Sequence, residues 1–380
     1  RRLLLVFLPA YAVLAGGAPS VNRAVFMGIC LLLFSQRRNN IHPIDGLGLS
    51  FILFIIYNPY LLYHPGFQLS YLVTAVLLFS RKLFQTLQGK IRPLIAVSFI
   101  AQVASMPILL LHFYEISLLS FLLNILYVPL FSSVVLPLCL LCFGLMQVPF
   151  LNDWISGILN GILLIANKMA LLFADFTVFT ITLGKPPIII FLIYILIILT
   201  IFVQLERKSW RSKNVYFLFM IPVFMHLACV KWSPIGEIVF LDVGQGDSIV
   251  IKLPFNKGNY VIDTGGVIDF PKEKWMERAR PYDPGERVVL PFLKSKGITK
   301  LDALILTHGD ADHIGGAKAL INNIKIRNVL VGATVEKSNL EMDVIQSAYL
   351  NGGKVVEARE GERWTDGGYD FYILSPPEGT

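Results

Sequence analysis

The sequence has 380 residues, of which 55% are hydrophobic, and its mean hydropathy is +0.63. Values this high exclude an ordinary soluble globular protein and predict that part of the chain lies in lipid. Charge is unevenly distributed, since residues 1–231 carry 16 Lys and Arg against 5 Asp and Glu, whereas residues 232–380 carry 17 against 21. We therefore expect an apolar, basic region followed by a polar, acidic one.

Apolar runs near bilayer-spanning length follow one another from the start of the chain. They predict membrane helices at 3–15, 19–35, 44–58, 66–80, 93–111, 117–147, 157–180, 187–205 and 215–231. The run at 117–147 contains Pro129 and Pro137, so it is expected to form one tilted or broken crossing. The chain begins with Arg1 rather than Met and stops just after a strand-like run, which predicts a piece truncated at both ends.

The basic residues predict the orientation of these helices, because Lys and Arg accumulate in short cytoplasmic loops. If 117–147 crosses once, the basic groups at 1–2, 37–38, 81–92 and 206–213 all lie on one side. The last helix then runs outward. Everything after Lys231 is expected to be extracytoplasmic.

Beyond residue 232 the pattern changes to short β-rich runs separated by Gly, Pro and Asn. Strands are expected in EIVFLDV, DSIVIKLP, NYVIDTGG and LDALILT, and helices at 287–296, 315–323 and 340–350. The charged, Pro-rich stretch 267–287 is typical of a surface insertion. The predicted domains are therefore a membrane domain, a basic loop with the last helix, and a mixed α/β domain, at 1–205, 206–231 and 232–380.

The stretch THGDADHIGG, residues 307–316, directly follows the strand predicted in LDALILT. His308 and Asp310 stand at i and i+2 of an extended segment, so they point to the same side. Asp312 and His313 point toward a neighbouring position, and the two pairs can therefore address two adjacent cations. Two cations about 3.5–4 Å apart can activate water and stabilise the oxygens of an in-line phosphoryl displacement. An acidic turn with incidental histidines is the alternative interpretation.

Several stretches resemble a known family. HGDADH resembles the H-x-H-x-D-H motif of the metallo-β-lactamase fold, with Asp310 where most members carry a second His. FLDVGQGDSIVI and YVIDTGG resemble the opening strands of the subgroup attached to the ComEC-type competence family, and GGAPSVNRAVFM and NPYLLYHPGFQLSYL resemble its membrane region. The resemblance implies a polytopic α-helical membrane domain followed by an α/β (αββα) metallo-β-lactamase-fold domain, truncated at its C-terminus.

The same resemblance implies roles for the motif residues. His308 and Asp310 would bind one metal ion, and Asp312 and His313 the other. Asp312 would also position the attacking water. Two further carboxylates, Asp263 and Asp247, would steady the loop from behind the ligands, although turn formation beside glycine explains them equally well.

The implied cofactors are two divalent metal ions, manganese or zinc, with magnesium as a further candidate. Asp310 replaces an imidazole with a hard oxygen donor, which shifts the preference from zinc toward manganese or magnesium. The fold uses further ligands downstream, including two histidines, whereas this chain has no His after His313. The site is therefore expected to be incomplete in this chain.

The resemblance implies DNA uptake during natural transformation, across a bacterial plasma membrane. A polyanion that crosses a bilayer needs a polar route, and Gln68, Glu115, Asn124 and Lys168 are the candidate channel residues. Each of them is equally compatible with snorkelling or with hydrogen bonds between helices. The implied partners are DNA, membrane lipid, a DNA receptor with pilus machinery outside, and a cytoplasmic ATP-driven translocase with single-strand-binding proteins. Association of the chain into a homo-oligomer is a further alternative.

DNA binding is not independently indicated by charge, because residues 232–380 are net negative and a duplex-binding surface should be basic. The stretches PKEKWMERARP and KSKGITK are compatible with a local basic face, with Trp275 available for stacking, or with an ordinary solvated surface. Three interpretations follow: a DNA channel with an outer metal-dependent nuclease, a membrane-anchored metallohydrolase of another ester, and a channel whose outer domain only docks DNA.

Overall fold

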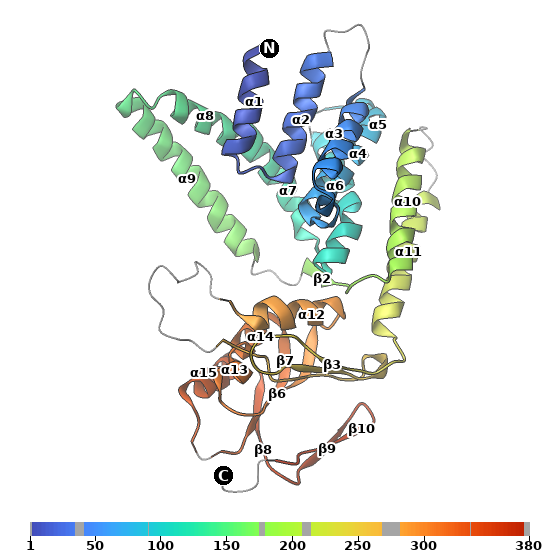
Figure 1. Cartoon of the computed structure of the whole chain (residues 1–380), viewed down its shortest axis with the longest axis vertical. Coiled ribbons are helices and arrows are strands. Elements are labelled where there is room, and N and C mark those ends of the chain that lie inside the picture. The colour runs from blue at the N-terminus through green and yellow to red at the C-terminus, as the bar shows by residue number, and fades with distance from the viewer. Residues whose placement is uncertain are drawn as a thin grey trace. The chain divides into compact units, whose positions relative to one another are not determined.

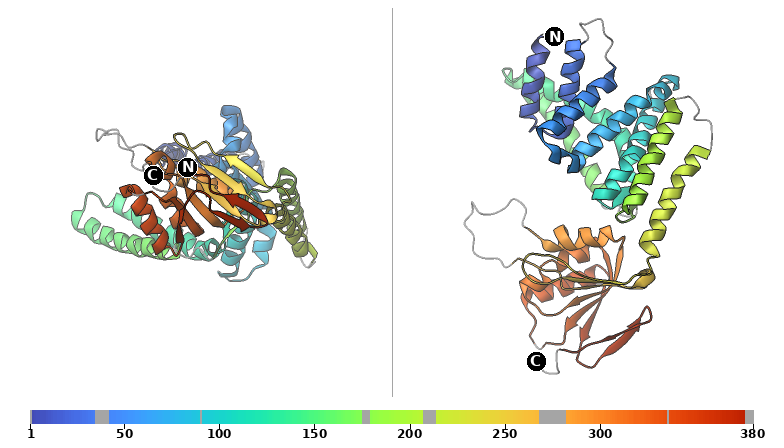
Figure 2. Two further views of the ribbon diagram at one scale, coloured as in Figure 1. Left: turned by 90° about the horizontal axis from the view of Figure 1, so that it is seen from below. Right: turned by 45° about the vertical axis from the view of Figure 1, so that its right-hand side comes forward.

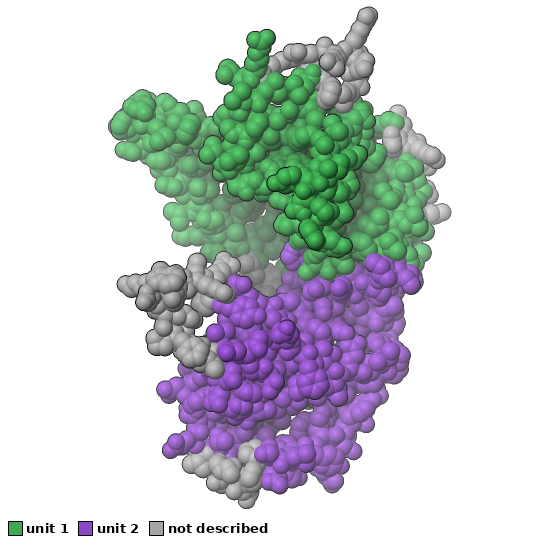
Figure 3. All heavy atoms as spheres, viewed as in Figure 1, with its two compact units in different colours: residues 1–112, 116–181, 191–221 green, residues 113–115, 182–190, 222–380 purple. Residues whose placement is uncertain are grey.

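The computed structural model describes residues 2–34, 42–89, 91–174, 179–206, 214–267, 282–334 and 336–375. The chain forms two compact units, which Figure 3 shows in green and purple. Unit 1 comprises residues 1–112, 116–181 and 191–221, and unit 2 comprises residues 113–115, 182–190 and 222–380. Each unit has its own hydrophobic core.

Unit 1 is helical, as the apolar runs predict (Figure 1). The helices are α1 (Arg2–Leu14), α2 (Pro19–Phe34), α3 (Pro43–Tyr57), α4 (Pro65–Phe79), α5 (Arg81–Thr86), α6 (Ile91–His112), α7 (Leu119–Leu130), α8 (Leu136–Gly144), α9 (Pro149–Ala174) and α10 (Ile188–Glu206), and α11 (Asn214–Lys231) continues into unit 2. Proline is the first residue of α2, α3, α4 and α9, where its missing N–H would have no partner within the helix.

Three of the described helical stretches are long and apolar enough to cross a membrane, namely Ile91–His112, Leu119–Gly144 and Pro149–Phe173. The second lies within the run 117–147, for which one broken crossing is predicted, and it is one interrupted helical stretch of sufficient length. It consists of α7, a π-turn at Phe131–Val135 and α8. The π-turn lies between Pro129 and Pro137, which both lack the N–H that regular α-helical bonding requires.

Seven of the predicted helices begin and end within two residues of their observed bounds, but the prediction for α9 was wrong by more. The run was placed at 157–180, whereas α9 begins at Pro149 and ends at Ala174. The first turns contain Asn152 and Asp153, which lower the local hydropathy without preventing a helix. A hydropathy pattern alone therefore starts this helix too late.

The core of unit 1 includes a cluster at the junction of α4, α6 and α10. Val76, Ile100, Ala104, Ile198 and Phe202 are buried there. The small side chain of Ala104 is completely buried and allows the neighbouring helices to approach closely. This packing fixes the relative positions of the helices that carry the polar residues of unit 1.

Unit 2 contains a six-stranded sheet in the order β3-β4-β5-β6-β7-β8 (Figures 1 and 2). The strands are β3 (Glu237–Phe240), β4 (Ile249–Lys252), β5 (Asn259–Ile262), β6 (Lys300–Leu306), β7 (Lys325–Gly332) and β8 (Lys354–Ala358). Strands β3, β4 and β5 pair antiparallel, while β5, β6, β7 and β8 pair parallel. Strands β3 and β8 form the two edges of the sheet.

Each face of this sheet has its own cover. Helices α12 (Leu290–Ser295), α14 (Ala317–Asn323) and α15 (Asn339–Leu350) contribute to one apolar core, with Leu304 and Val329 from the strands. The hairpin of β9 (Arg363–Asp366) and β10 (Tyr369–Tyr372) packs on the other face through Trp364 and Phe371. The described part of the domain is therefore helix, sheet and hairpin in layers, in agreement with the α/β fold that the sequence predicts.

Unit 2 extends beyond the domain boundary expected at residue 232. Two segments from the helical half belong to it, because their backbone groups hydrogen-bond within it: Leu183 N donates to Tyr114 O at 3.1 Å, and Lys185 N donates to Ser295 O at 2.7 Å. Most of the predicted insertion at 267–287, including Trp275 and its basic neighbours, lies outside the described residues.

Candidate metal centre

The candidate centre lies where β5 and β6 end. These strands are parallel neighbours in register, with Val261 opposite Leu304 and Ile262 opposite Ile305. Parallel strands bring their carboxyl ends to one edge of the sheet, so the residue after β5 and the residues after β6 meet there. Asp263 follows β5, and Thr307 and His308 follow β6.

Asp263 is the buried anchor of this edge, with 2% of its surface exposed. Its Oδ1 accepts a hydrogen bond from Thr307 N at 2.9 Å, and its Oδ2 accepts one from Thr307 Oγ1 at 2.6 Å. The backbone of Asp263 is left-handed, with φ of 54°. A non-glycine residue adopts this conformation at a cost of about 1–2 kcal/mol, which the hydrogen bonds of the side chain offset.

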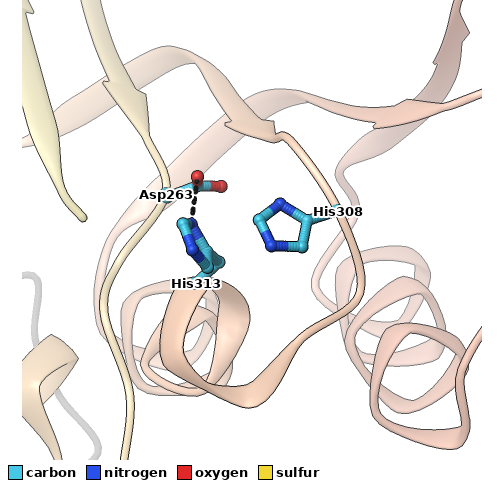
Figure 4. A group of neighbouring side chains, drawn as sticks. All are labelled: Asp263, His308 and His313. Atoms are coloured by element: carbon cyan, nitrogen blue, oxygen red, sulfur yellow. Dashed lines mark hydrogen bonds and ion pairs between the residues drawn. The ribbon is translucent and has the colours of Figure 1, made fainter. Parts of the chain in front are cut away.

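The hydrogen bonds of Asp263 and Thr307 also orient both histidines. Figure 4 shows the side chains of Asp263, His308 and His313, with the bond between Asp263 and His313 dashed. His313 Nδ1 lies 2.9 Å from Asp263 Oδ2, so it donates to the carboxylate. The hydroxyl of Thr307 gives its single proton to Asp263, and its oxygen therefore accepts from His308 Nδ1 at 2.9 Å. In the neutral form of each ring, these bonds place the proton on Nδ1 and leave Nε2 available to bind a metal ion.

The two expected ligand pairs are present in space. His308 Nε2 lies 3.5 Å from Asp310 Oδ2, and His313 Nε2 lies 3.9 Å from Asp312 Oδ2. Two donors that each lie about 2.0–2.2 Å from one cation are roughly 3–4 Å apart, so both pairs have a compatible spacing. The two rings are close to each other, with centroids 3.9 Å apart.

The candidate donor side chains differ in their exposure to solvent. This difference distinguishes the residues that can bind a metal ion from Asp263, which positions them. The side chains of Asp310, His308 and Asp312 are 76%, 46% and 31% exposed, so cations and substrate can reach them. Asp263 also lies with its donor atoms within 4.8 Å of His308 and His313. Its two oxygens already accept three hydrogen bonds, however, and we therefore place it behind the ligands rather than among them.

Glycines bring two other loops against the ligand helix α13 (Ala311–Ile314). A Cβ added to Gly246 would lie 1.6 Å from the Asp312 carbonyl oxygen, and one added to Gly266 would lie 1.6 Å from that of Ala311. Thr264 N and Oγ1 donate to the His313 carbonyl at 2.8 and 3.1 Å. The DVGQGD and DTGG stretches therefore fix the backbone from which Asp312 and His313 project.

Helix α15 supports the loop from the other side. Ser338 caps this helix by accepting from Glu341 N at 3.1 Å, and its Oγ donates to Gly309 O at 2.9 Å. Gly309 separates His308 from Asp310, so Ser338 holds the turn between the two expected ligands of one pair. Neither Ser338 nor Thr307 was predicted from the sequence as a site residue, although the S-x-x-E pattern of a helix start points to Ser338.

Asp247 contributes in a different way from the expected carboxylate contact. Its side chain is exposed, and the hydrogen bond that ties it to the site is made by its backbone carbonyl, which accepts from Gly265 N at 2.9 Å. Position 247 therefore supports the DTGG loop through the main chain. This geometry fits the turn-forming alternative for Asp247.

The four candidate channel residues occupy different settings. The Oε1 atom of Gln68 in α4 lies 2.9 Å from Nε2 of His112, and the Nε2 atom of Gln68 donates to Leu62 O at 2.6 Å. Asn124 is half-buried in α7, and Lys168 is exposed on α9. Glu115 lies in the short strand β1 (Glu115–Ser117) rather than in a helix, and its carboxylate pairs with Lys294 Nζ at 2.9 Å.

The lysines of KSKGITK are also largely engaged. Lys294 pairs with Glu115, and Lys296 forms an ion pair and hydrogen bond with Glu237. Among the described residues of this stretch, only Lys300 is exposed without such a pair. The geometry favours a charge-balanced surface here over a basic face for DNA.

Comparison with known proteins relates both halves of the chain to described families. Residues 2–208 match the competence protein family, and residues 241–378 match the metallo-β-lactamase superfamily. Over 98% of its length the chain is 35% identical to ComE operon protein 3 of Bacillus subtilis (strain 168) and 26% identical to Recombination protein 2 of Haemophilus influenzae. It is 23% identical to competence protein ComA of Neisseria gonorrhoeae over 97%. The chain spans about half the length of these relatives, covering 48%, 48% and 47% of them.

Proposed function

Because the chain belongs to the competence protein family and carries a metallo-β-lactamase-superfamily domain, we propose that it takes part in DNA uptake during natural transformation. The membrane region passes a single strand inward. The domain at 232–380 lies outside the cytoplasm and hydrolyses phosphodiester bonds, either of the opposite strand or of the incoming duplex.

The observation that carries the catalytic half of this proposal is the pairing of donors at one strand edge. His308 with Asp310, and Asp312 with His313, offer two neighbouring sets of imidazole nitrogen and carboxylate oxygen. Manganese and zinc accept such mixed donors, and magnesium favours the oxygens. Divalent cations bound there supply Lewis-acid activation of water and of the phosphoryl oxygens.

The chain's own residues supply position and protonation state. Asp263 and Thr307 keep both histidines in one tautomer, which removes the cost of reorienting them for each catalytic cycle. Asp312, at 31% exposure, can accept a proton from a water molecule that approaches a phosphodiester from the open side. His308 and Asp310 remain open to solvent at the same face.

The transport half of the proposal draws on the membrane region. One apolar helix would suffice as an anchor, whereas this chain has three long spans and further shorter apolar helices among its described residues. Gln68, Asn124 and Lys168 place polar groups on three of these helices, as a route for a polyanion requires. The basic loops favour an outward position for the C-terminal domain.

The proposal extends to partners of the uptake pathway. A DNA receptor and pilus machinery deliver the duplex outside, and a cytoplasmic ATP-driven translocase pulls the strand that single-strand-binding proteins then coat. Association into a homo-oligomer is included, because polar groups on separate helices of several copies can line one path.

The catalytic proposal is tested on the purified full-length protein with end-labelled DNA and Mn²⁺. Asp312→Asn should abolish cleavage, and His308→Ala should do the same. Asp343→Asn is the matched control, because this carboxylate is 64% exposed on α15 and pairs only loosely with Lys318. Full cleavage by Asp312→Asn would reject the catalytic assignment.

The transport proposal is tested separately by uptake of labelled DNA into cells. Gln68→Ala combined with Asn124→Ala should reduce uptake, whereas Arg92→Gln, on an exposed position of α6, should not. Unchanged uptake would favour a membrane-anchored hydrolase of another ester. Reduced uptake by a protein that binds no Mn²⁺ or Zn²⁺ at micromolar concentration would favour an outer domain that only docks DNA.

A further inference from the structure

Arg23 stands in the second turn of α2, whose remaining residues carry no charge. Placing a guanidinium in a membrane helix costs about 2.5–3.5 kcal/mol on insertion scales, so such residues face a protein interior or a hydrated cavity and have a partner. Arg23 is only partly exposed, which agrees with an inward-facing position. The identity of its partner is therefore informative.

The observed partner of Arg23 is neutral. Its Nη1 donates to the backbone carbonyl of Ser70 at 3.1 Å, in the second turn of α4. The Nε atom of Arg23 is buried and has no hydrogen-bond partner. Within the described part of the chain no Asp or Glu pairs with this guanidinium. Among the described residues of unit 1, this positive charge therefore has no counter-charge within ion-pair distance.

A second unmet donor lies on the same residue that accepts from Arg23. The hydroxyl oxygen of Ser70 is buried and also lacks a partner. Buried polar groups are rarely left unsatisfied, and an uncompensated charge is the costliest case. Two donors from adjacent helices, one of them cationic, are complementary to an anion with at least two acceptor oxygens.

The surroundings of this pair are polar at the same end of the helices. Gln68, one turn or less from Ser70 on α4, pairs with His112, the last residue of α6. Around this position Gln68 Oε1 and the backbone carbonyl of Ser70 are acceptors. The Nε of Arg23 and the hydroxyl group of Ser70 are the buried polar groups there that lack a partner.

We propose that Arg23 and Ser70 form a binding site for a phosphodiester group within the membrane region. A phosphodiester carries one negative charge and two free oxygens, which matches the guanidinium and hydroxyl donors. The inference rests on the proposed function in one respect, because DNA transport makes the single strand the source of the phosphodiester. A phospholipid headgroup is the other source of the same chemistry.

Binding of single-stranded DNA at this site is tested by the salt dependence of its affinity. The affinity of a labelled single-stranded oligonucleotide is measured on the full-length protein in phospholipid-free detergent micelles. Losing one phosphate contact lowers the slope of log K against log salt by about 0.7 for a single strand. Arg23→Gln should show that decrease, whereas the exposed control Arg92→Gln should keep the wild-type slope. Arg23→Lys should keep the slope but bind more weakly, because it loses the fork of donors.

A purely structural role for Arg23 would weaken binding without changing the slope. The slope therefore distinguishes a direct phosphate contact from a structural role. Headgroup binding is tested in parallel by the thermal stabilisation that added phosphatidylglycerol gives to wild type and to Arg23→Gln. Loss of that stabilisation with an unchanged slope assigns the site to lipid. If both measurements are unchanged, or if Arg23→Lys loses the slope as Arg23→Gln does, the site is rejected. Failure of the wild-type protein to bind the oligonucleotide at all would instead reject the proposed DNA transport, while the lipid measurement still tests the site.

Discussion

The Oδ2 atom of Asp263 lies 2.9 Å from Nδ1 of His313, and this contact ties the end of β5 to helix α13. The backbone of Asp263 is in the left-handed conformation, which glycine adopts most easily. Such conformations persist where the surrounding structure over-determines them, and they cluster at functional sites. Here the carboxylate accepts three hydrogen bonds, so its position is fixed before any ligand arrives.

Asp263→Asn should weaken metal binding without unfolding the domain. Asn tolerates the left-handed backbone, but its amide carries no charge to stabilise the His313 Nδ1–H. The affinity of the full-length protein for Mn²⁺ should fall about 10- to 100-fold, as measured by isothermal titration calorimetry. Asp343→Asn, on the exposed face of α15, is the control. Wild-type affinity in Asp263→Asn would show that this hydrogen bond does not tune the site.

Thr307 should matter through its hydroxyl group and not through its methyl group. Its Oγ1 donates to Asp263 and accepts from His308, so Thr307→Val removes both bonds while keeping the shape. We expect Thr307→Val to lower Mn²⁺ affinity about tenfold or more, and Thr307→Ser to restore it. The tautomer of His308, read from its ¹⁵N chemical shifts, should become mixed in the valine variant alone. A single tautomer in Thr307→Val would contradict the assigned hydrogen-bond direction.

Gly246 and Gly244 form a matched pair for testing the loop that packs on Asp312. Both have positive φ, 78° and 89°, so alanine strains the backbone at either position by about 1 kcal/mol. An added Cβ would lie 1.6 Å from the Asp312 carbonyl at Gly246 but meets nothing within 4 Å at Gly244. Gly246→Ala should therefore displace Asp312 and abolish the proposed nuclease activity, whereas Gly244→Ala should retain most of it. Equal activities would show that the backbone of Asp312 can shift freely.

The order of helices and the ligand pairs were predictable because each is a local property of the sequence. Apolar runs of fixed length locate α1 to α4 and α6 closely, whereas the short helix α5 lies in a stretch expected to be a basic loop. The i, i+2 spacing of His308 and Asp310 places both side chains on one side of the strand end. Strands β7 and β8 were not predicted. Charged residues interrupt the apolar runs of both strands, Lys325 and Arg327 in β7 and Lys354 and Glu357 in β8, so β7 and β8 are recognisable only once their pairing is known.

The support of the site could not be derived from spacing alone. Asp263 and Thr307 are 44 positions apart, and Ser338 lies 29 positions beyond Gly309. Each pair meets only because parallel strands carry loops to one edge of the sheet. Glu115 is a case in which the sequence pattern misleads. Its position next to an apolar run indicated a channel residue, but in the folded chain its carboxylate forms an ion pair with Lys294.

The hairpin β9–β10 should depend on the hydrogen bond from Tyr260 to Asp366. Tyr260 OH donates to Asp366 Oδ2 at 2.6 Å, and burial, reinforced by that carboxylate, raises the pKa of Tyr260. The stability that this bond provides is present below the unfolded pKa of about 10 and is lost as pH rises above it. Tyr260→Phe should cost about 1–3 kcal/mol near neutral pH and remove this alkaline loss.

The stability of Tyr260→Phe is measured by unfolding followed through the fluorescence of Trp364, which stacks on Phe371 in the hairpin. Tyr369→Phe is the control, because Tyr369 in β10 is 44% exposed. Mn²⁺ affinity should be unaffected in both variants. A Tyr260→Phe protein that unfolds like wild type at neutral pH would show that apolar packing alone holds the hairpin.

The proposed outward position of the C-terminal domain gives a prediction that is independent of metal and DNA. Lys318 is 54% exposed on α14, and Arg81 is exposed on α5, in a basic loop that should face the cytoplasm. A membrane-impermeant maleimide applied to intact cells should therefore label Lys318→Cys and leave Arg81→Cys unlabelled until the membrane is permeabilised. The unsubstituted protein, whose four cysteines lie in apolar helices, measures the background. Labelling of Arg81→Cys alone would place the domain in the cytoplasm, where it could not act on DNA before entry.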